Sequence, residues 1–380
     1  MHAASVGEVT GAIPIVHALR ESLPGAGLTL TVTTPQGFRF AGTNLSRWAE
    51  ILPFPLDFPG VLQRAFQKLE PDLYVALEAE FWPNLFRMLE CRQTPAVLLN
   101  GRLSHRSARL YGFFKSTFRP IFRQFSCLAM HSEEDRKNVV LLGVPPERTC
   151  VLGSSKYDAI VLRKDPEKVE HLKRVLNLPG NVPVVVGGSL RRLECIWLLE
   201  VFRSLSHVDP GLVGIFAPRH MAQVPNMIKW LDSAPFPYQL LSRIEAGQEA
   251  RSAPVILVDR IGILFDLYAL GDLVFCGGTL EPFDGHNILE PAAWGKPVFY
   301  GPHLQKVLVE HNMLQSFKGS FLVQDSGDLL QQWTYWIERL PLLKRHGENA
   351  RAALLKLGGV SARQVDIILS ALSDRASSHA

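Results

Sequence analysis

The chain has 380 residues, of which 47% are hydrophobic and 20% are charged, and its formal net charge is +4. This length is more than one compact core usually accommodates and predicts two domains, while the composition excludes a disordered or collagen-like chain. The mild basic excess fits an anionic small substrate or an acidic membrane surface and gives no reason to expect nucleic acid as a partner.

The five cysteines are widely spaced and never form a Cys-x-x-Cys pair. We therefore expect neither a disulfide framework nor a zinc site, and a reducing compartment is the natural one. No apolar run reaches the roughly 18 residues of a membrane-spanning helix. His2 and Glu8 interrupt the region where a signal peptide would have its apolar core. The chain as given is expected to be soluble or peripheral to a membrane.

Short apolar or β-branched runs alternate with helical patterns along the whole chain. Strands are predicted at 27–33, 73–77, 95–99, 183–187, 212–217, 254–258, 272–276 and 297–300. Helices are predicted near 9–22, 58–69, 107–124, 132–141, 192–205, 221–232, 262–270 and 305–317. Strands that are apolar throughout and alternate with helices indicate parallel sheets covered on both faces. The predicted fold class is therefore α/β and doubly wound.

A domain boundary is predicted after the turn Gly-Ser-Ser-Lys-Tyr-Asp at 153–158, where a charged stretch begins. The alternation of strands and helices then starts again at Pro183. Residues 1–158 and 159–380 are expected to form two Rossmann-like domains that face each other across a cleft. Ligands of open α/β sheets bind outside the carboxyl ends of the strands, so the residues that follow each strand are the candidates for function.

Glu8 lies at the start of the first predicted helix, and two interpretations of it stay open. It can complete a capping box with Ser5 as the N-cap residue, since it follows three positions later. It can also be a functional carboxylate. In that case we expect the helix dipole to lower its pKa, so that it is ionised and able to accept a proton.

Three more charged side chains follow strands of the first half. Glu78 and Glu80 come directly after strand 73–77 and before a helix that begins near Pro83. Helix capping is the favoured interpretation for Glu80, whereas Glu78 is the better candidate for the cleft. Lys156 is a lone cation in a turn of small residues. Such a lysine is usually solvated, but a turn that opens onto a cleft can present it to a phosphate or a carboxylate.

The second half contains the pattern of a nucleotide site. Arg219 follows strand 212–217 and can offer a planar fork to a phosphate, although a basic residue after a strand is common. Gly277 and Gly278 allow a sharp turn after strand 272–276. Residues 285–287 (Gly, His, Asn) then open a helix whose first turn contains Glu290. A helix start bounded by glycines suits a phosphate, and Glu290 can accept hydrogen bonds from a ribose diol.

Several reaction classes lack their motifs. There is no dinucleotide-binding glycine fingerprint, no P-loop, no Gly-x-Ser-x-Gly elbow and no His-Glu-x-x-His. No Asp-x-Asp is present either, which disfavours metal-assisted nucleotide-sugar chemistry. A leaving phosphate would then be neutralised by arginine, lysine and helix dipoles.

Taken in order, these motifs resemble the 3-deoxy-D-manno-octulosonic acid (Kdo) transferase family of lipopolysaccharide synthesis. The likeness covers nearly the whole chain and includes HAASVGE, LEAEFWPN, NGRLSHRS, GSSKYD, APRH and GGTLEPFDGHNILEPAAWGKPVFYGPH. It implies a GT-B fold, CMP-Kdo as donor, a lipid A precursor (lipid IVA) as acceptor, inversion at the anomeric carbon, and neither a metal nor another cofactor. The resemblance also implies that the protein acts at the cytoplasmic face of the inner membrane, where this chain would be a peripheral protein.

The resemblance also implies roles for individual residues. Glu8 matches the family's proton acceptor, and Glu78 and Lys156 match positions that stabilise the transition state. The CMP-binding segments match Pro218 and Arg219, then Ile261, Gly262 and Ile263, and finally Asn287, Ile288, Leu289 and Glu290.

The chain departs from the family pattern in three places. The hydrophobic anchor and the strand that lead into the catalytic loop of relatives do not precede His2, so the first strand of the sheet is expected to be missing. Ile263 stands where relatives often carry Glu. A contact made through backbone amides would survive that change, whereas a side-chain contact would not. Phe283 and Asp284 replace a more basic or glycine-rich pair.

Two other functions stay open on the sequence: a GT-B transferase that uses a UDP-sugar, and an inactive nucleotide-binding relative.

A further expectation concerns the membrane. No acidic residue lies between Glu90 and Glu133, and basic and aromatic residues are interleaved in 107–124. Such a helix suits the interface of an anionic membrane. We therefore expect 107–124 to dock the first domain on the inner membrane.

Overall fold

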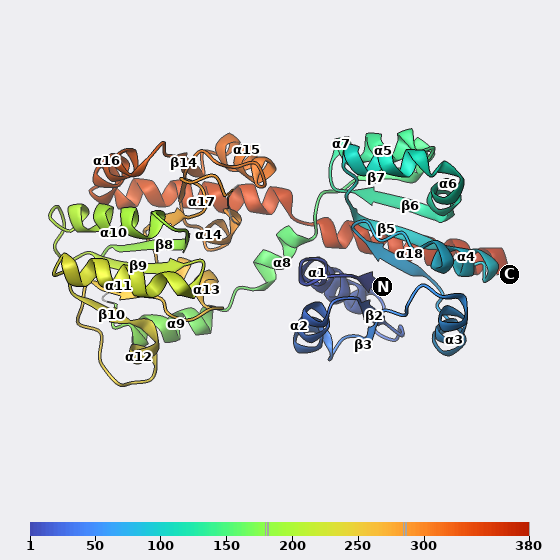
Figure 1. The fold of residues 1–380 in the computed structure, drawn as a ribbon, viewed down its shortest axis with the longest axis horizontal. Coiled ribbons are helices and arrows are strands. Elements are labelled where there is room, and N and C mark those ends of the chain that lie inside the picture. Colours follow the sequence, from blue (N-terminus) through green and yellow to red (C-terminus); the bar gives the residue numbers. More distant parts are fainter. Residues whose placement is uncertain (179, 181, 284, 286, 380) are drawn as a thin grey trace. The chain divides into compact units, whose positions relative to one another are not determined.

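The computed structural model describes residues 1–178, 180, 182–283, 285 and 287–379. Two compact units make up the chain (Figure 1). Unit 1 consists of Met1–Leu162 together with Leu357–Ala380, and unit 2 consists of Arg163–Lys356.

Unit 1 is built on a parallel sheet with the strand order β3-β2-β1-β4-β5-β6-β7. Its strands are β1 (His2–Ala3), β2 (Thr29–Val32), β3 (Glu50–Pro53), β4 (Tyr74–Leu77), β5 (Ala96–Gly101), β6 (Phe125–Met130) and β7 (Thr149–Val151). Its helices are α1 (Val6–Ser22), α2 (Pro35–Leu45), α3 (Pro59–Leu69), α4 (Pro83–Cys91), α5 (His105–Phe113), α6 (Lys115–Gln124), α7 (Glu133–Leu141), the 3-10 helix η1 (Pro146–Arg148), α8 (Lys156–Leu162) and α18 (Val360–His379).

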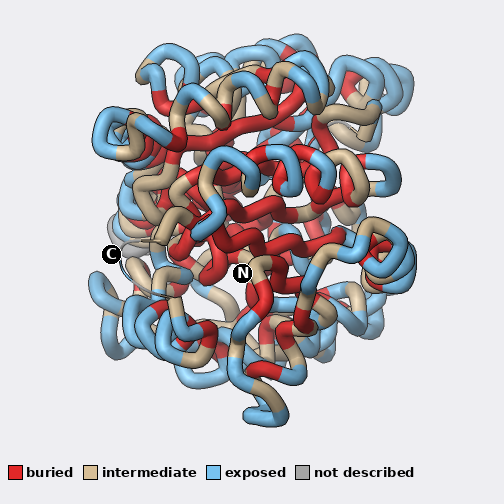
Figure 2. The backbone as a smooth tube through the Cα atoms, turned by 90° about the vertical axis from the view of Figure 1, so that its left-hand side faces the viewer, coloured by how far each residue is buried: buried red, intermediate tan, exposed pale blue. Residues whose placement is uncertain are grey.

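The central strands of unit 1 are buried on both faces because their side chains alternate between two cores. In β4, Tyr74 and Ala76 pack with α3 and α4, whereas Val75 and Leu77 pack with α1 and α18. Figure 1 shows the helices on both sides of the sheet. In Figure 2, where unit 2 faces the viewer, buried residues lie along the strands and exposed residues lie on the outer faces of the helices. Alternation between two cores explains why the strand is apolar at every position.

Unit 2 repeats this architecture with the strand order β10-β11-β9-β8-β12-β13-β14, again parallel. Its strands are β8 (Val184–Leu190), β9 (Val213–Pro218), β10 (Tyr238–Leu240), β11 (Val255–Leu257), β12 (Leu273–Cys276), β13 (Val298–Tyr300) and β14 (Ser320–Leu322). Its helices are α9 (Pro166–Val175), α10 (Glu194–Leu205), the 3-10 helix η2 (Met221–Gln223), α11 (Val224–Ser233), α12 (Leu241–Glu245), α13 (Leu264–Tyr268), α14 (Leu289–Ala293), α15 (Leu308–Ser316), α16 (Ser326–Ile337) and α17 (Leu340–Leu357). The chain runs from β8 to β9 on one side and later to β12 on the other. The carboxyl end of β8 is therefore the switch point at which doubly wound sheets bind ligands.

The α/β, doubly wound prediction is confirmed, and each of the eight predicted strands corresponds to an observed strand. The expectation that the first strand is missing is wrong: His2 and Ala3 form β1, which pairs with Thr31 and Val32 of β2 and with Ala76 of β4. The prediction of one continuous helix at 107–124 is also wrong. The backbone leaves the helical region at Phe114 (φ −102°, ψ 41°), and this break separates α5 from α6.

The units differ from the predicted domains at the end of the chain. Residues 357–380 were expected in the second domain, but α18 packs on α1 and adds Val365 and Ile368 to the core of unit 1. The Asp158 carboxylate joins the two segments, since it accepts the N–H groups of Gly359 at 2.6 Å and Ser361 at 2.7 Å. No helix in the described part of the chain combines the length and the apolar character needed to cross a bilayer.

Candidate functional site

The predicted catalytic residues of unit 1 all follow strands at the carboxyl edge of the sheet. Glu8 lies in the first turn of α1, which follows β1. Glu78 follows β4, and Lys156 begins α8 after β7. Since the strands are parallel, their carboxyl ends lie at one edge of the sheet, and the structure brings the three side chains to it.

Glu8 is held by the cap of its own helix. Ser5 is the N-cap residue with an extended backbone, and its Oγ accepts the N–H of Glu8 at 3.4 Å. In return the Glu8 carboxylate accepts the N–H of Ala4 at 2.7 Å and the hydroxyl of Ser5 at 3.2 Å. The capping interpretation is confirmed. It does not compete with a functional carboxylate, because the cap fixes where the carboxylate points.

The pKa of Glu8 is raised to about 7, mainly by burial and in addition by the negative charges of Glu78 and Glu80. The hydrogen bonds from Ala4 and Ser5 act in the opposite direction. The expectation that the helix dipole lowers this pKa is therefore wrong, since desolvation outweighs the stabilisation of the charge at the helix start. A carboxylate with a pKa near 7 is well matched to general base catalysis at neutral pH.

Glu78 and Lys156 form an ion pair, with 2.5 Å between Nζ and Oε1. Both side chains are partly exposed, at 23% and 30%. Glu78 has a positive φ of 60°, which is strained for a residue with a β-carbon and is often found at functional sites. A β-carbon placed on Gly7 would lie 3.7 Å from the Lys156 ammonium, so Lys156 also lies beside the first turn of α1.

A buried hydrogen-bond network beneath these side chains was not found from the sequence. Ser155 donates its hydroxyl to the carbonyl of Gly11 at 2.7 Å and its N–H to the Asn100 side chain at 2.9 Å. Asn100 donates to the Ser155 hydroxyl at 2.8 Å and accepts a hydrogen bond from Gln364 at 2.9 Å. The network joins α1, β5, the Lys156 turn and α18. Asn100 follows a predicted strand, which was the available signal.

The capping interpretation of Glu80 is wrong. Helix α4 is capped instead by Asp57, whose carboxylate accepts the N–H groups of Asn84 at 3.1 Å and Leu85 at 2.8 Å. Glu80 accepts the indole N–H of Trp82 at 2.8 Å, and its Oε2 lies 3.8 Å from Nε2 of the fully buried His2. The nearby His2 ring, followed by the hydrogen bond from Trp82, lowers the pKa of Glu80. Its carboxylate therefore adds a negative charge near Glu8.

In unit 2, the predicted CMP-binding segments also follow strands. Pro218 ends β9, and Arg219 is anchored by its N–H, which donates to the carbonyl of Leu190 at 2.8 Å, while its side chain is exposed. Ile261 is 78% exposed, whereas Ile263 is 1% exposed and is the N-cap residue of α13. The Ile263 side chain belongs to the core, so this segment can offer a ligand the backbone around Gly262 rather than a side chain at 263.

The second segment, at the start of α14, has buried anchors and one partly buried carboxylate. Ile288 and Leu289 are fully buried, and the side chain of Asn287 accepts the N–H of Leu289 at 3.2 Å. Glu290 accepts a hydrogen bond from Arg163 at 2.8 Å. Burial raises the pKa of Glu290, while the positive charges of Arg163 and Arg219 lower it.

Glu290 therefore pairs with Arg163 and lies within electrostatic range of Arg219. Nothing in the sequence pointed to Arg163 beyond its charge next to the predicted boundary. The predicted residues Asp284 and His286 lie outside the described residues. A carboxylate beside two arginines can accept hydrogen bonds from ribose hydroxyls while the arginines face a phosphate.

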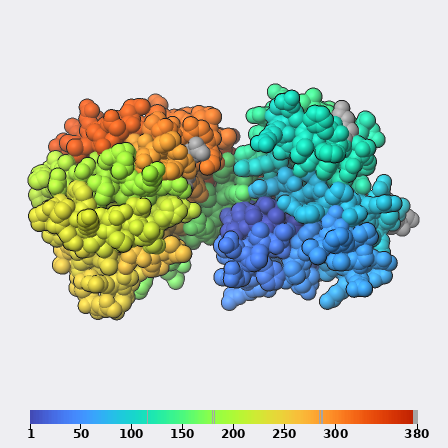
Figure 3. Space-filling view, viewed as in Figure 1, coloured from blue at the N-terminus to red at the C-terminus, as the bar shows by residue number. Residues whose placement is uncertain are grey.

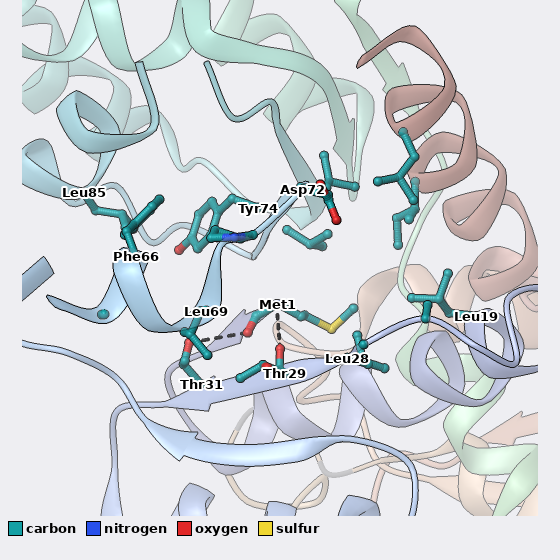
Figure 4. A pocket seen from close by; sticks show the side chains of 18 of the residues that line it. Met1, Leu19, Leu28, Thr29, Thr31, Phe66, Leu69, Asp72, Tyr74 and Leu85 are labelled. Carbon is teal, nitrogen blue, oxygen red and sulfur yellow. Dashed lines mark hydrogen bonds between the residues drawn. The ribbon is translucent and has the colours of Figure 1, made fainter. Parts of the chain in front are cut away.

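A cavity of about 280 Å³ lies at the opposite edge of the unit 1 sheet, where β1, β2 and β4 begin. Its lining is mostly apolar, and Figure 4 shows Met1 and Tyr74 on opposite sides of it. Glu8, Glu78 and Lys156 are not among its lining residues. The cavity is therefore separate from the candidate catalytic residues.

Comparison with solved structures identifies the class of fold. UDP-GlcNAc 2-epimerase from Neisseria meningitidis, solved with UDP-GlcNAc bound, superposes with a TM-score of 0.66 at 15% identity and covers 98% of both chains. Two parallel Rossmann-like units of this kind, each with its candidate residues at the carboxyl edge, define the GT-B fold of glycosyltransferases.

The family follows from sequence comparison. Residues 1–159 match the family model described as 3-deoxy-D-manno-octulosonic-acid transferase (kdotransferase). The Haemophilus influenzae 3-deoxy-D-manno-octulosonic acid transferase is 31% identical over 332 residues, which are 87% of this chain and 77% of that protein. The Chlamydia pneumoniae transferase is 31% identical over 306 residues, covering 80% and 69%. The chain belongs to the 3-deoxy-D-manno-octulosonic-acid transferase family, which confirms the predicted resemblance.

Proposed function

We propose that this protein transfers a Kdo residue from CMP-Kdo to a lipid A precursor, lipid IVA, in lipopolysaccharide synthesis. The observation that carries the proposal is Glu8, in a chain of this family. Its carboxylate is fixed by a capping box at the carboxyl edge of the sheet, and its pKa is raised to about 7. Beside it lie Glu78 and Lys156, which match the family's transition-state residues.

In the proposed reaction, Glu8 accepts the proton of an acceptor hydroxyl. The acceptor oxygen forms a bond to the anomeric carbon of Kdo from the face opposite CMP, and the bond from that carbon to the phosphate oxygen breaks. CMP leaves with the electron pair, so the anomeric configuration is inverted. General base catalysis supplies about 10²–10⁴-fold of the acceleration, and positioning and charge stabilisation must supply the rest.

Unit 2 is the proposed donor-binding unit. Arg219 would neutralise the phosphate of CMP, with the segments 261–263 and 287–290 around the nucleotide. Since one carboxylate oxygen of Glu290 already accepts Arg163, its other oxygen would accept the ribose hydroxyls. Lys156 would add positive charge as the phosphate departs, and its ion pair with Glu78 holds it in place until then.

The reaction is tested by incubating the protein with CMP-Kdo and lipid IVA and measuring the masses of the lipid products by mass spectrometry. We expect lipid with added Kdo, and no product when a UDP-sugar replaces CMP-Kdo. Transfer from the UDP-sugar instead would support the alternative GT-B transferase. Binding of CMP without any transfer would support the inactive relative.

We also propose that α5 and α6 dock unit 1 on the anionic inner membrane. Part of this segment is core, since Phe122 is 1% exposed and Tyr111 packs on Phe118. Phe113 and Phe114 are nevertheless 84% and 56% exposed at the break between the helices. Figure 3 shows this segment, in teal, on the surface of unit 1.

The charges of this surface have one sign: Arg106, Arg109, Arg119 and Arg123 are exposed, while the side chain of Lys115 lies outside the described part. Basic residues near an anionic bilayer contribute about 1 kcal/mol each. Binding to anionic vesicles should therefore fall with salt, and fall further in Arg109→Gln/Arg119→Gln. Arg39→Gln/Arg47→Gln, which changes two exposed arginines outside this surface, is the matched control. Equal binding to neutral vesicles would contradict the docking surface.

A further inference from the structure

A fully buried carboxylate of unit 2 has no role in the reaction described so far. Glu194, the first residue of α10, is 0% exposed. Its carboxylate accepts the backbone N–H groups of Gly278 at 2.6 Å, Thr279 at 3.0 Å and Leu280 at 2.9 Å. It also accepts the N–H of Arg191 at 2.9 Å. Four N–H donors on one buried carboxylate form a strong connection, because hydrogen bonds to a charged acceptor are about twice as strong as neutral ones.

The two segments that Glu194 connects lie at the switch point of the sheet. Residues 189–193 run from the last two residues of β8 into the loop before α10, and the turn 277–280 follows the neighbouring β12. They are so close that a β-carbon on Gly277 would lie 2.7 Å from both the Leu190 Cα and the Ser189 carbonyl oxygen. The glycine at 277 is therefore required by this approach.

Each segment in turn holds one part of the candidate donor site. The carbonyl of Leu190, the last residue of β8, accepts the N–H of Arg219 at 2.8 Å, so the 189–193 segment anchors the arginine. The carbonyl of Gly278 accepts the N–H of Gly285 at 2.9 Å, two residues before Asn287, so the turn anchors the segment that leads to Glu290. The connection through Glu194 links the anchors of Arg219 and Glu290.

Successive backbone N–H groups in a turn commonly bind a phosphate. Here those of Gly278, Thr279 and Leu280 are already used by a carboxylate of the protein itself. The turn therefore serves to hold the site, and the donor phosphate must be neutralised by other groups, such as Arg219.

We propose that Glu194 is a positioning residue for donor binding, which sets the separation of Arg219 and Glu290 through the two segments it joins. The proposal rests on the proposed function, because it takes CMP-Kdo as the ligand. In Glu194→Gln the side chain keeps its size, but its NH₂ group meets N–H groups that need an acceptor. The turn and the loop then separate, and neither Arg219 nor Glu290 is held where it can bind CMP.

The test compares Glu194→Gln with Asp272→Asn. Asp272 is a matched control because its carboxylate also joins β12 to β8, through the N–H of Val184 at 3.0 Å, but at the opposite end of the strands. For Glu194→Gln we expect the Kd for CMP and the KM for CMP-Kdo to rise at least about tenfold, with a smaller fall in kcat, since Arg219 and Glu290 are proposed to bind the nucleotide before the reaction begins. Asp272→Asn should lose stability without a change in Kd.

Wild-type affinity for CMP in Glu194→Gln would overturn the proposal, and so would equal weakening by Asp272→Asn. Should Glu194→Gln fail to fold, Glu194→Asp keeps the charge on a shorter side chain and should give an intermediate Kd.

Amide hydrogen exchange is the readout that does not depend on CMP. Faster exchange confined to Arg191 and 278–280 supports the connection, and unchanged protection there overturns it. If wild type does not bind CMP, the donor assignment fails, and exchange alone decides whether Glu194 holds the turn.

Discussion

At the residue scale, the Glu8 carboxylate completes a helix cap and is also the base of the proposed reaction. Its contacts with Ala4 and Ser5 close the start of α1 and fix the direction of the side chain. Burial near Glu78 and Glu80 keeps its pKa at about 7 rather than at the value of a solvated glutamate. A base of this strength is mostly ionised above neutral pH and still able to take a proton, which suits deprotonation of an alcohol.

The first prediction concerns pH. A general base acts in its ionised form, so kcat/KM should rise with pH through about 7, the pKa of Glu8, and fall on the acidic side. Glu80→Gln removes a negative charge that raises this pKa, so its acidic limb should move to lower pH. Glu50→Gln, on an exposed residue at the start of β3, should leave the profile unchanged. An acidic limb near pH 4.5 in wild type would contradict the assignment.

The second prediction concerns donor binding. Arg219→Ala and Glu290→Ala should each weaken CMP binding by about 1.5–3 kcal/mol, the range for a lost hydrogen bond to a charged group. Calorimetry with CMP measures both, with Arg243→Ala on the surface of α12 as the control. Unchanged affinity in both variants would show that CMP binds elsewhere.

At the scale of elements, the parts of the fold that could be predicted from the sequence are those with a clear pattern of burial. Strands such as β4 and β8 are apolar at successive positions because both faces are covered, and this pattern is visible without a structure. Strand β1 was missed because its two residues are too few to show the hydrophobic pattern of a strand. The break between α5 and α6 was missed because Phe114, at the break, is neither glycine nor proline.

The same limit applies to the candidate site. Glu8, Glu78 and Lys156 could be predicted because each follows a strand or starts a helix. The network beneath them could not, since Asn100 meets Ser155 across 55 positions of sequence and Gln364 across 264. The pKa of Glu8 was predicted in the wrong direction because its burial depends on the packing of unit 1.

The third prediction tests this network. Ser155→Ala removes the hydroxyl that accepts from the buried NH₂ group of Asn100 and donates to the carbonyl of Gly11, so it should lower the free energy of unfolding by about 1–3 kcal/mol. Urea unfolding provides the measurement. Ser22→Ala removes an exposed hydroxyl bonded to a helix carbonyl of α1 and should change stability by less than about 0.5 kcal/mol. Equal effects of the two changes would mean that the network is not important for stability.

At the scale of the whole molecule, unit 1 is discontinuous in sequence. The chain leaves it after Leu162, forms unit 2, and returns as α18. Sequence patterns group a segment with its neighbours along the chain, so they placed α18 with unit 2. The contacts that hold α18, from Asp158 to Ser361 and from Val365 to the core of unit 1, lie far apart in the sequence.

The fourth prediction follows from this topology. Deleting residues 360–380 should expose the apolar surface of α1 and destabilise unit 1, while unit 2 keeps its own core. Hydrogen exchange resolves the two: amides of α1 and β5 should exchange faster, whereas those of β8 and β12 should not. Faster exchange in both units alike would mean that α18 stabilises the whole chain rather than unit 1.

The central claim is that the protein transfers Kdo with Glu8 as the base, and acceptor-dependent release of CMP measures it most directly. CMP-Kdo is supplied with and without lipid IVA to the wild type and to Glu8→Gln, and CMP binding is measured alongside. We predict that lipid IVA strongly stimulates CMP release by the wild type. Glu8→Gln should release CMP at less than about a tenth of that rate, with nearly unchanged CMP affinity, since base catalysis contributes at least about 10²-fold. The claim would be contradicted if CMP release by the wild type did not depend on lipid IVA. It would also be contradicted if Glu8→Gln released CMP at more than about a tenth of the wild-type rate.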